Sequence, residues 1–151
     1  MDETYIKVNG KWKYLYRVVD KCGDTVDFLL TAKRYTKAAL RFLKKAIGAN
    51  GVPEKINIDK SGANTAGIKA LNDEVGTTIE IRQCKYLNNI VEQDHRAVKR
   101  MVRPMMGFKA FYSAQTTLAG IELMHMIRKG QMRSSRCHEI SHIEECYALA
   151  A

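Results

Sequence analysis

The spacing of the apolar residues changes near Thr36, and this change constrains the fold more than any other feature of the chain. Three short segments before it are rich in aromatic and β-branched residues: Tyr5–Val8, Trp12–Val19 and Val26–Leu30. Asn9-Gly10 and Cys22-Gly23-Asp24 separate these segments, and both sequences favour tight turns. We therefore predict an antiparallel meander of three strands.

After Thr36 the apolar residues mostly follow the period of an amphipathic helix, with short strand-like segments between the helices. The expected helices are Thr36 to Ile47, about Thr65 to Glu74, Ile90–Val102, and Ser113 to about Lys129, with Ser113 as the cap of the last. The expected strands are Lys55–Ile58 and Thr77–Arg82. Three antiparallel strands followed by this alternation predict an α/β protein with a mixed sheet and helices on its faces.

The length and composition are those of one ordinary globular domain. Of 151 residues, 46% are hydrophobic and 27% are charged. No segment has the roughly 18 uncharged apolar residues that a membrane span needs, and the start lacks the apolar core of a signal peptide, so we expect a cytoplasmic protein with no membrane partner. The net charge of +9 favours a polyanion such as nucleic acid, although a basic protein without such a partner fits it too.

Three carboxylates stand at positions that could form one site. Asp2 opens the first strand, Asp59 ends the strand Lys55–Ile58, and Glu92 lies at the start of a polar helix. Mg²⁺ prefers carboxylate oxygens, and two such ions can hold both oxygens of a phosphodiester displacement. Each residue alone also has an ordinary explanation, since aspartate is common in turns and glutamate is favoured near a helix N-terminus.

Basic residues follow Glu92 on the same helix. His95, Arg96 and Lys99 lie three, four and seven residues after it, a spacing that predicts a shared face. A basic stripe beside a metal-binding carboxylate suits DNA phosphates. The alternative is an exposed helix with ordinary ion pairs.

Two other patterns have weaker functional interpretations. Cys137, His138, His142 and Cys146 in the tail could hold zinc, but the spacing lacks the usual paired loops, and a surface tail is the alternative. Trp12, Tyr14 and Tyr16 alternate along a strand, and sheet packing explains them better than base stacking.

The chain resembles the DDE transposases of bacterial insertion sequences, specifically the insertion-sequence-six family. Four segments carry the resemblance: MDETYIKVNGKWKYLYRVVDK (1–21), INIDKSGAN (56–64), KYLNNIVEQDHRAVKRMVRPMMGFKAF (85–111) and SAQTTLAGIELMHMIRKGQ (113–131). The acidic triad of that family falls on Asp2, Asp59 and Glu92, as catalytic residues and metal ligands. Its basic residue seven positions after the glutamate falls on Lys99, and we expect Arg96 and His95 to contact DNA beside it.

The resemblance implies a ribonuclease-H-like fold over residues 1–131, with a polar tail at 132–151. It implies DNA cleavage and strand transfer with Mg²⁺, or Mn²⁺ in its place, on insertion-sequence ends and target DNA, by a homo-oligomer that holds two ends together. Family members carry a helix-turn-helix region and further first-strand residues before the DET motif, so this chain is expected to be an N-terminally truncated catalytic domain. The alternatives are an inactive DNA-binding or oligomerisation fragment and a ribonuclease-H-like nuclease.

Overall fold

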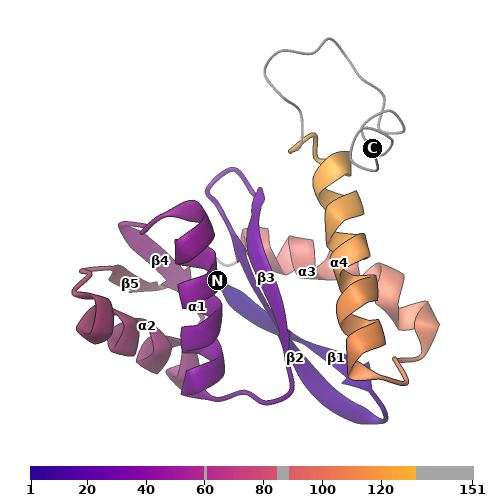
Figure 1. Ribbon diagram of the computed structural model, residues 1–151. Helices are drawn as coiled ribbons and strands as arrows, with labels where there is room; N and C mark the ends of the chain where they lie inside the picture. The colour runs from indigo at the N-terminus through magenta and orange to yellow at the C-terminus, as the bar shows by residue number, and fades with distance from the viewer. Residues whose placement is uncertain (60, 85–88, 132–151) are drawn as a thin grey trace.

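The computed structural model describes residues 1–59, 61–84 and 89–131 (Figure 1). Its elements are β1 (Asp2–Val8), β2 (Lys11–Val19), β3 (Thr25–Thr31), α1 (Thr36–Asn50), β4 (Lys55–Ile58), α2 (Gly62–Val75), β5 (Glu80–Gln83), α3 (Asn89–Val102), the short 3₁₀ helix η2 (Arg103–Met105) and α4 (Phe111–Arg128). This order agrees with the order predicted from the sequence. One predicted cap is wrong: Ala110, in an extended conformation, occupies the N-cap position of α4, and Ser113 lies inside the helix.

The first three strands form an antiparallel sheet in the order β1-β2-β3. Asn9 and Gly10, with φ of 48° and 71°, form the turn between β1 and β2. Two successive residues with positive φ match the right-handed twist of a hairpin, which explains why this sequence turns here. The resulting register places Asp2 opposite Arg17.

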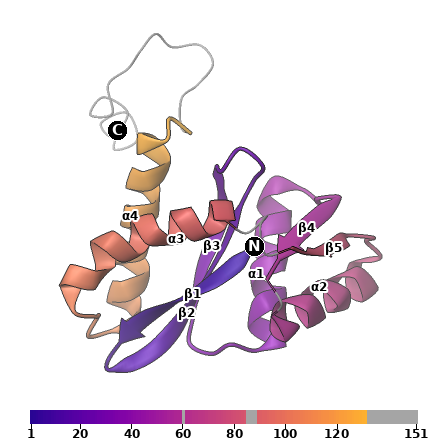
Figure 2. The same cartoon turned by 180° about the vertical axis from the view of Figure 1, so that it is seen from behind.

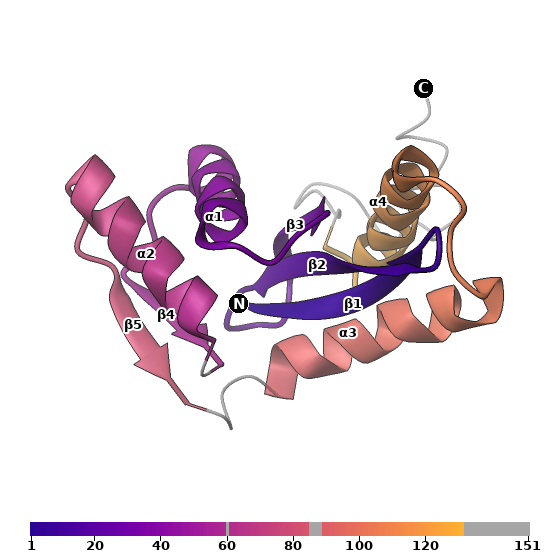
Figure 3. The same ribbon diagram turned by 90° about the horizontal axis from the view of Figure 1, so that it is seen from below.

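The last two strands, β4 and β5, form a separate parallel pair. The amino group of Met1 donates to the carbonyl oxygen of Asn57 at 2.7 Å, so the start of β1 meets β4. Figures 1 and 3 show the N-terminus beside β4, between the two sheets. This contact brings the start of β1 close to the end of β4, where Asp59 follows Ile58.

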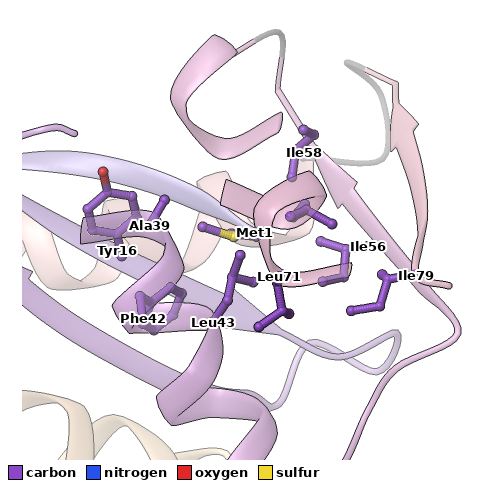
Figure 4. Packing of buried hydrophobic residues seen from close by; sticks show 10 residues of the cluster. Met1, Tyr16, Ala39, Phe42, Leu43, Ile56, Ile58, Leu71 and Ile79 are labelled. Atoms are coloured by element: carbon purple, nitrogen blue, oxygen red, sulfur yellow. The ribbon is translucent and has the colours of Figure 1, made fainter. Parts of the chain in front are cut away.

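Helices cover both faces of the antiparallel sheet, as predicted. Tyr16 points toward α1 and α2 and joins a core that includes Phe42, Leu43 and Leu71 (Figure 4). The preceding residue, Leu15, points to the opposite face, where it packs in a second core with residues of α3 and α4. Successive side chains of a strand alternate between faces, so β2 contributes to both cores. Figure 2 shows α3 and α4 together, away from α1 and α2.

No helix in the described part of the chain is long and apolar enough to cross a membrane. The tail at 132–151, with the Cys137, His138, His142 and Cys146 motif, lies outside the described residues.

Candidate active site

Asp2 and Asp59 lie together at the junction of the two sheets. One carboxylate oxygen from each, with one from Glu3, forms a group of three atoms within 4.8 Å of one another. Asp2 is placed by its pairing in β1, and Asp59 directly follows β4. The N–H of Ser61 donates to Oδ1 of Asp59 at 3.1 Å, which helps to orient this carboxylate at the turn into α2.

Glu3 is the member of this group that the sequence did not predict. Its carboxylate forms an ion pair with Arg34 and accepts a hydrogen bond of 2.6 Å from the amide of Asn64. Alternation along β1 places Glu3 and Asp2 on opposite faces, which argued against a shared site. The adjacency of the two residues was the only signal in the sequence. Because Arg34 and Asn64 already engage Glu3, its first role is to attach the α1–α2 side of the molecule to β1.

The carboxylate of Asp2 is held in a poor environment for a negative charge. Burial is the main cause that raises the pKa of Asp2 to about 6. The nearby carboxylates of Asp59 and Glu3 contribute to the rise, and a hydrogen bond from the N–H of Glu3 to Asp2 opposes it. Clustered carboxylates that repel one another are relieved by a divalent cation, and their oxygens are the ligands that Mg²⁺ prefers. The donor set therefore fits the magnesium or manganese ion that the resemblance implies.

Glu92 lies in the first turn of α3, with its side chain exposed. It does not belong to the group of three carboxylates found among the described residues. The same helix reaches that group through His95, whose Nε2 lies 3.6 Å from Oδ2 of Asp2. Figure 3 shows α3 running beside β1. The helix that carries Glu92 is therefore adjacent to the site. Of the three predicted carboxylates, Asp2 and Asp59 are the two that the structure brings together.

His95 does not share an exposed face with the other predicted basic residues. Its residue exposure is 4%, whereas Arg96 is exposed and Lys99 is half-buried. Burial, together with the positive charges of Arg17 and Lys99, lowers the pKa of His95 to about 3, so the imidazole is neutral at pH 7. The predicted stripe of three basic side chains is wrong at this position, because α3 packs its His95 side against β1.

A buried ion network lies beneath α3 and was not predicted. Arg17 of β2 is fully buried and bonds Glu122 of α4 at 2.6 Å and Asp94 of α3 at 3.3 Å. Asp94 also pairs with His125 at 3.2 Å and with Lys129 at 2.8 Å. The network joins a strand to two helices and fixes α3 against the sheet. Arg17 and Glu122 are 105 positions apart, so only the tertiary fold brings them together.

Comparisons with known proteins identify the family of the chain. A family described as a DDE domain matches residues 1–131. The chain is 39% identical, over 93% of its length, to the transposase for insertion sequence-like element IS431mec of Staphylococcus aureus strain Mu50. It is equally similar to the Staphylococcus aureus transposase for insertion sequence element IS257 in transposon Tn4003. The chain spans 65% of the length of each of these relatives.

A solved structure supports the predicted fold. The chain is similar to a chain in the cryo-electron microscopy structure of the simian T-cell lymphotropic virus intasome in complex with PP2A regulatory subunit B56 gamma. The TM-score is 0.55 with 19% identity, over 66% of this chain and 37% of the other. At that identity the likeness concerns the fold alone. The prediction of a ribonuclease-H-like α/β fold is confirmed, with helices on both faces of the antiparallel sheet, but among the described residues β4 and β5 form a separate parallel pair and do not complete one mixed sheet.

Proposed function

Since the chain belongs to the DDE-domain family of insertion-sequence transposases, we propose that it supplies the catalytic domain for metal-dependent DNA cleavage and strand transfer. The observation that carries this proposal is the meeting of Asp2 and Asp59 at the junction of the two sheets. Because the chain spans 65% of the length of its relatives, the proposal concerns the chemistry of this domain.

Asp2 and Asp59 would hold the magnesium or manganese ion, with Glu92 completing the ligand set from the start of α3. When bound, such an ion polarises the phosphodiester and stabilises the charge on the attacking and leaving oxygens. The raised pKa of Asp2 supports this assignment, because the site disfavours carboxylate charge that has no cation beside it.

Residues of α3 position the carboxylate of Asp2 and bind DNA phosphates. The neutral His95 packs against Asp2 and limits the positions that its carboxylate can take. Lys99, one helical turn further along α3, and the exposed Arg96 carry positive charge for DNA phosphates. His95 is reassigned from a phosphate contact to a positioning residue, because a buried neutral ring cannot neutralise a phosphate.

The proposed reaction has two in-line displacements at phosphorus. In the first, a water oxygen forms a bond to the phosphorus at the element's end and loses a proton, while the bond to the 3′-oxygen breaks and this oxygen takes up a proton. In the second, the freed 3′-hydroxyl loses its proton and bonds to a target phosphorus, while the displaced target 3′-oxygen takes up a proton. Each step exchanges one oxygen on phosphorus for another, so no cofactor is consumed.

Strand transfer of this kind needs two DNA ends held together with the target. We infer that two or more copies of the chain assemble around the insertion-sequence ends and the target DNA. The net positive charge of each copy contributes to its attraction to the DNA phosphates.

The proposal is tested by a strand-joining assay. Residues 1–131 replace the matching segment of the IS257 transposase, and the chimaera is mixed with a labelled IS257 end that already has a free 3′-hydroxyl, a target plasmid and Mn²⁺. We expect joined products with the unmodified chimaera and none with Asp2→Asn, Asp59→Asn or Glu92→Gln. Asp73→Asn is the matched control, because Asp73 is an exposed carboxylate on α2.

Two outcomes would contradict the proposal in different ways. Release of short products without joining would indicate a nuclease of the same fold. Undiminished joining by Glu92→Gln, with loss by Asp59→Asn, would remove Glu92 from the ligand set and leave the other two carboxylates in place.

A further inference from the structure

A pocket lies at the edge of the antiparallel sheet, further along β1 than the candidate active site. It has a volume of about 580 Å³ and lies between β1, the start of β2, the C-terminal end of α3 and the turn at Met106 and Gly107. This volume is within the range of pockets that bind small molecules or single chemical groups. None of the carboxylates of the candidate active site lines it.

Exposed aromatic rings line one side of this pocket. Trp12 is 61% exposed and Tyr5 is 48% exposed, and their rings meet edge to face with centroids 6.4 Å apart. Sheet packing accounts for Tyr16, which is fully buried against α1. It does not account for Trp12, whose ring lies mostly in solvent. A large apolar ring held in solvent beside a pocket is typical of a binding surface.

The charged side chains that line the pocket, among the described residues, are all basic. Lys7 comes from β1, Lys99 from α3 and Arg103 from the start of η2. Lys99 and Arg103 are four positions apart, which places them about 6 Å apart along the helix direction. Basic side chains around exposed aromatic rings form the combination that single-stranded nucleic acid recognises, since the charges hold phosphates and the rings stack on bases.

The wall of the pocket is attached firmly to β1. The N–H of Phe108 donates to the carbonyl of Lys7 at 2.9 Å, and the N–H of Asn9 donates to the carbonyl of Phe108 at 2.6 Å. Gly107 has φ of 104°, and a Cβ there would lie 3.1 Å from the carbonyl oxygen of Lys7. Glycine permits this approach, and the pocket is therefore preformed.

The pocket lies further along β1 and α3 than the candidate active site. Asp2 and Tyr5 are three residues apart on β1, so their side chains lie on opposite faces of the strand, and His95 and Lys99 are one turn apart on α3. Trp12 pairs with Lys7, five residues from Asp2, which corresponds to about 17 Å along the strand. A DNA strand that follows β1 from a phosphate reacting at Asp2 can thus place a base at Trp12 a few nucleotides away.

We propose that this pocket binds an unpaired DNA base a few nucleotides from the reacting phosphate, with Trp12 and Tyr5 as the stacking surface and Lys7, Lys99 and Arg103 as contacts to the flanking phosphates. The base must be unpaired, because a base inside a duplex is already stacked on its neighbours. The placement on the strand that carries the reacting phosphate rests on the proposed function, whereas the binding of an unpaired base does not.

The first experiment uses intrinsic fluorescence, because Trp12 is the single tryptophan of the chain. The 151-residue chain is titrated with an oligothymidylate of about 12 nucleotides and, separately, with an abasic strand of the same length and charge. Stacking predicts quenching of the tryptophan emission by the oligothymidylate and little quenching by the abasic strand. Equal quenching by both would overturn the proposal, because it would report phosphate binding alone.

The second experiment measures affinity with variants by fluorescence anisotropy of the labelled strands. Trp12→Ala should weaken binding of the oligothymidylate by about tenfold, the effect expected for one lost stacking contact, and leave the abasic strand unchanged. Trp12→Phe should restore most of the affinity. Tyr112→Ala is the matched control, because Tyr112 is 79% exposed on α4 and does not line the pocket. Equal losses for Trp12→Ala and Tyr112→Ala would overturn the proposal.

The strand-joining assay separates this inference from the proposed function. Base-dependent quenching in a protein that fails to join DNA would support base binding in the pocket and contradict the proposed transposase chemistry. Joining without base-dependent quenching would contradict base binding in the pocket and support the chemistry. Trp12→Ala in the chimaera should lower joining of a duplex end more than joining of an end whose bases a few nucleotides from the reacting phosphate are already unpaired, and the reverse order would count against placement on the strand that carries this phosphate.

Discussion

The Nε2 atom of His95 lies 3.6 Å from Oδ2 of Asp2. The imidazole is buried and neutral, and it belongs to the helix that also carries Glu92 and Lys99. Packing of this ring against the first carboxylate sets the position of α3 relative to β1. The contact therefore relates the carboxylate site on the sheet to the charged side chains on the helix.

The charged Lys99 and the buried, neutral His95 of α3 should differ in DNA binding. Lys99→Ala should reduce the slope of log affinity against log salt concentration by about one, because one phosphate contact and its released counterion are lost. His95→Gln should leave the slope unchanged, since a buried neutral ring releases no counterion. Lys69→Ala, on the exposed side of α2, is the control. A smaller slope for His95→Gln would return His95 to the phosphate contacts.

Metal binding should stabilise the folded chain through Asp59. A ligand that binds only the folded state at about 100 times its dissociation constant adds about 2.7 kcal/mol. We expect Mg²⁺ or Mn²⁺ to raise the melting temperature, and a chelator to reverse the rise. Asp59→Asn should lose the rise, whereas Asp73→Asn should retain it. A rise that persists in Asp59→Asn would place the metal elsewhere.

Stability should depend on pH through Glu122. Burial raises the pKa of Glu122 from 4.5 to about 7, although Arg17 lowers it in part. Between these pH values the folded state binds a proton that the unfolded state has lost, so the contribution of Glu122 to stability is full below pH 4.5 and is lost as pH rises through 7. At about 1.4 kcal/mol per pKa unit, the loss is roughly 3 kcal/mol.

The Glu122→Gln variant isolates this contribution. The free energy of unfolding, measured with urea, should increase for this variant relative to the unmodified chain as pH rises from 5 to 8, because glutamine does not ionise. The side-chain amide oxygen can still accept a hydrogen bond from Arg17. A constant difference across this range would mean that Arg17 keeps Glu122 ionised throughout.

Two glycines inside helices should respond in opposite directions to the same substitution. A Cβ at Gly67 of α2 would lie 2.9 Å from Cβ of Ala39 on α1, so Gly67→Ala should cost about 1–3 kcal/mol of stability by overpacking. Gly120 of α4 is exposed and has no such neighbour within 4 Å. Gly120→Ala should therefore stabilise by about 0.5–1 kcal/mol, because alanine favours helix. Similar effects of the two substitutions on thermal unfolding would contradict the close helix contact.

The order of the elements and the meeting of Asp2 with Asp59 could be argued from the sequence. Local patterns sufficed for the elements, since the Asn9-Gly10 turn and the spacing in α1 each act over a few residues. Asp59 was placed because it directly follows a short buried strand. Such residues lie at strand ends whatever the remainder of the chain does.

The buried polar residues could not be predicted in the same way. The buried stripe of α3 includes Asp94 and His95 beside apolar residues such as Val98, and a polar side chain in a helix is ordinarily assigned to solvent. The burial of Asp94 depends on its ion pair with Arg17 inside the protein. Arg17 lies on a strand that is distant in the sequence, so no local spacing predicts this pair.

The junction of the two sheets has a mechanical consequence. Asp2 lies on the three-stranded sheet, Asp59 lies at the end of the two-stranded one, and the bond from Met1 to Asn57 joins the sheets between them. An ion held by both carboxylates would act as a cross-link between the two sheets. Loading the site should then hold them more tightly together, and slower amide exchange in β5, the strand that carries no ligand of the ion, would record that change.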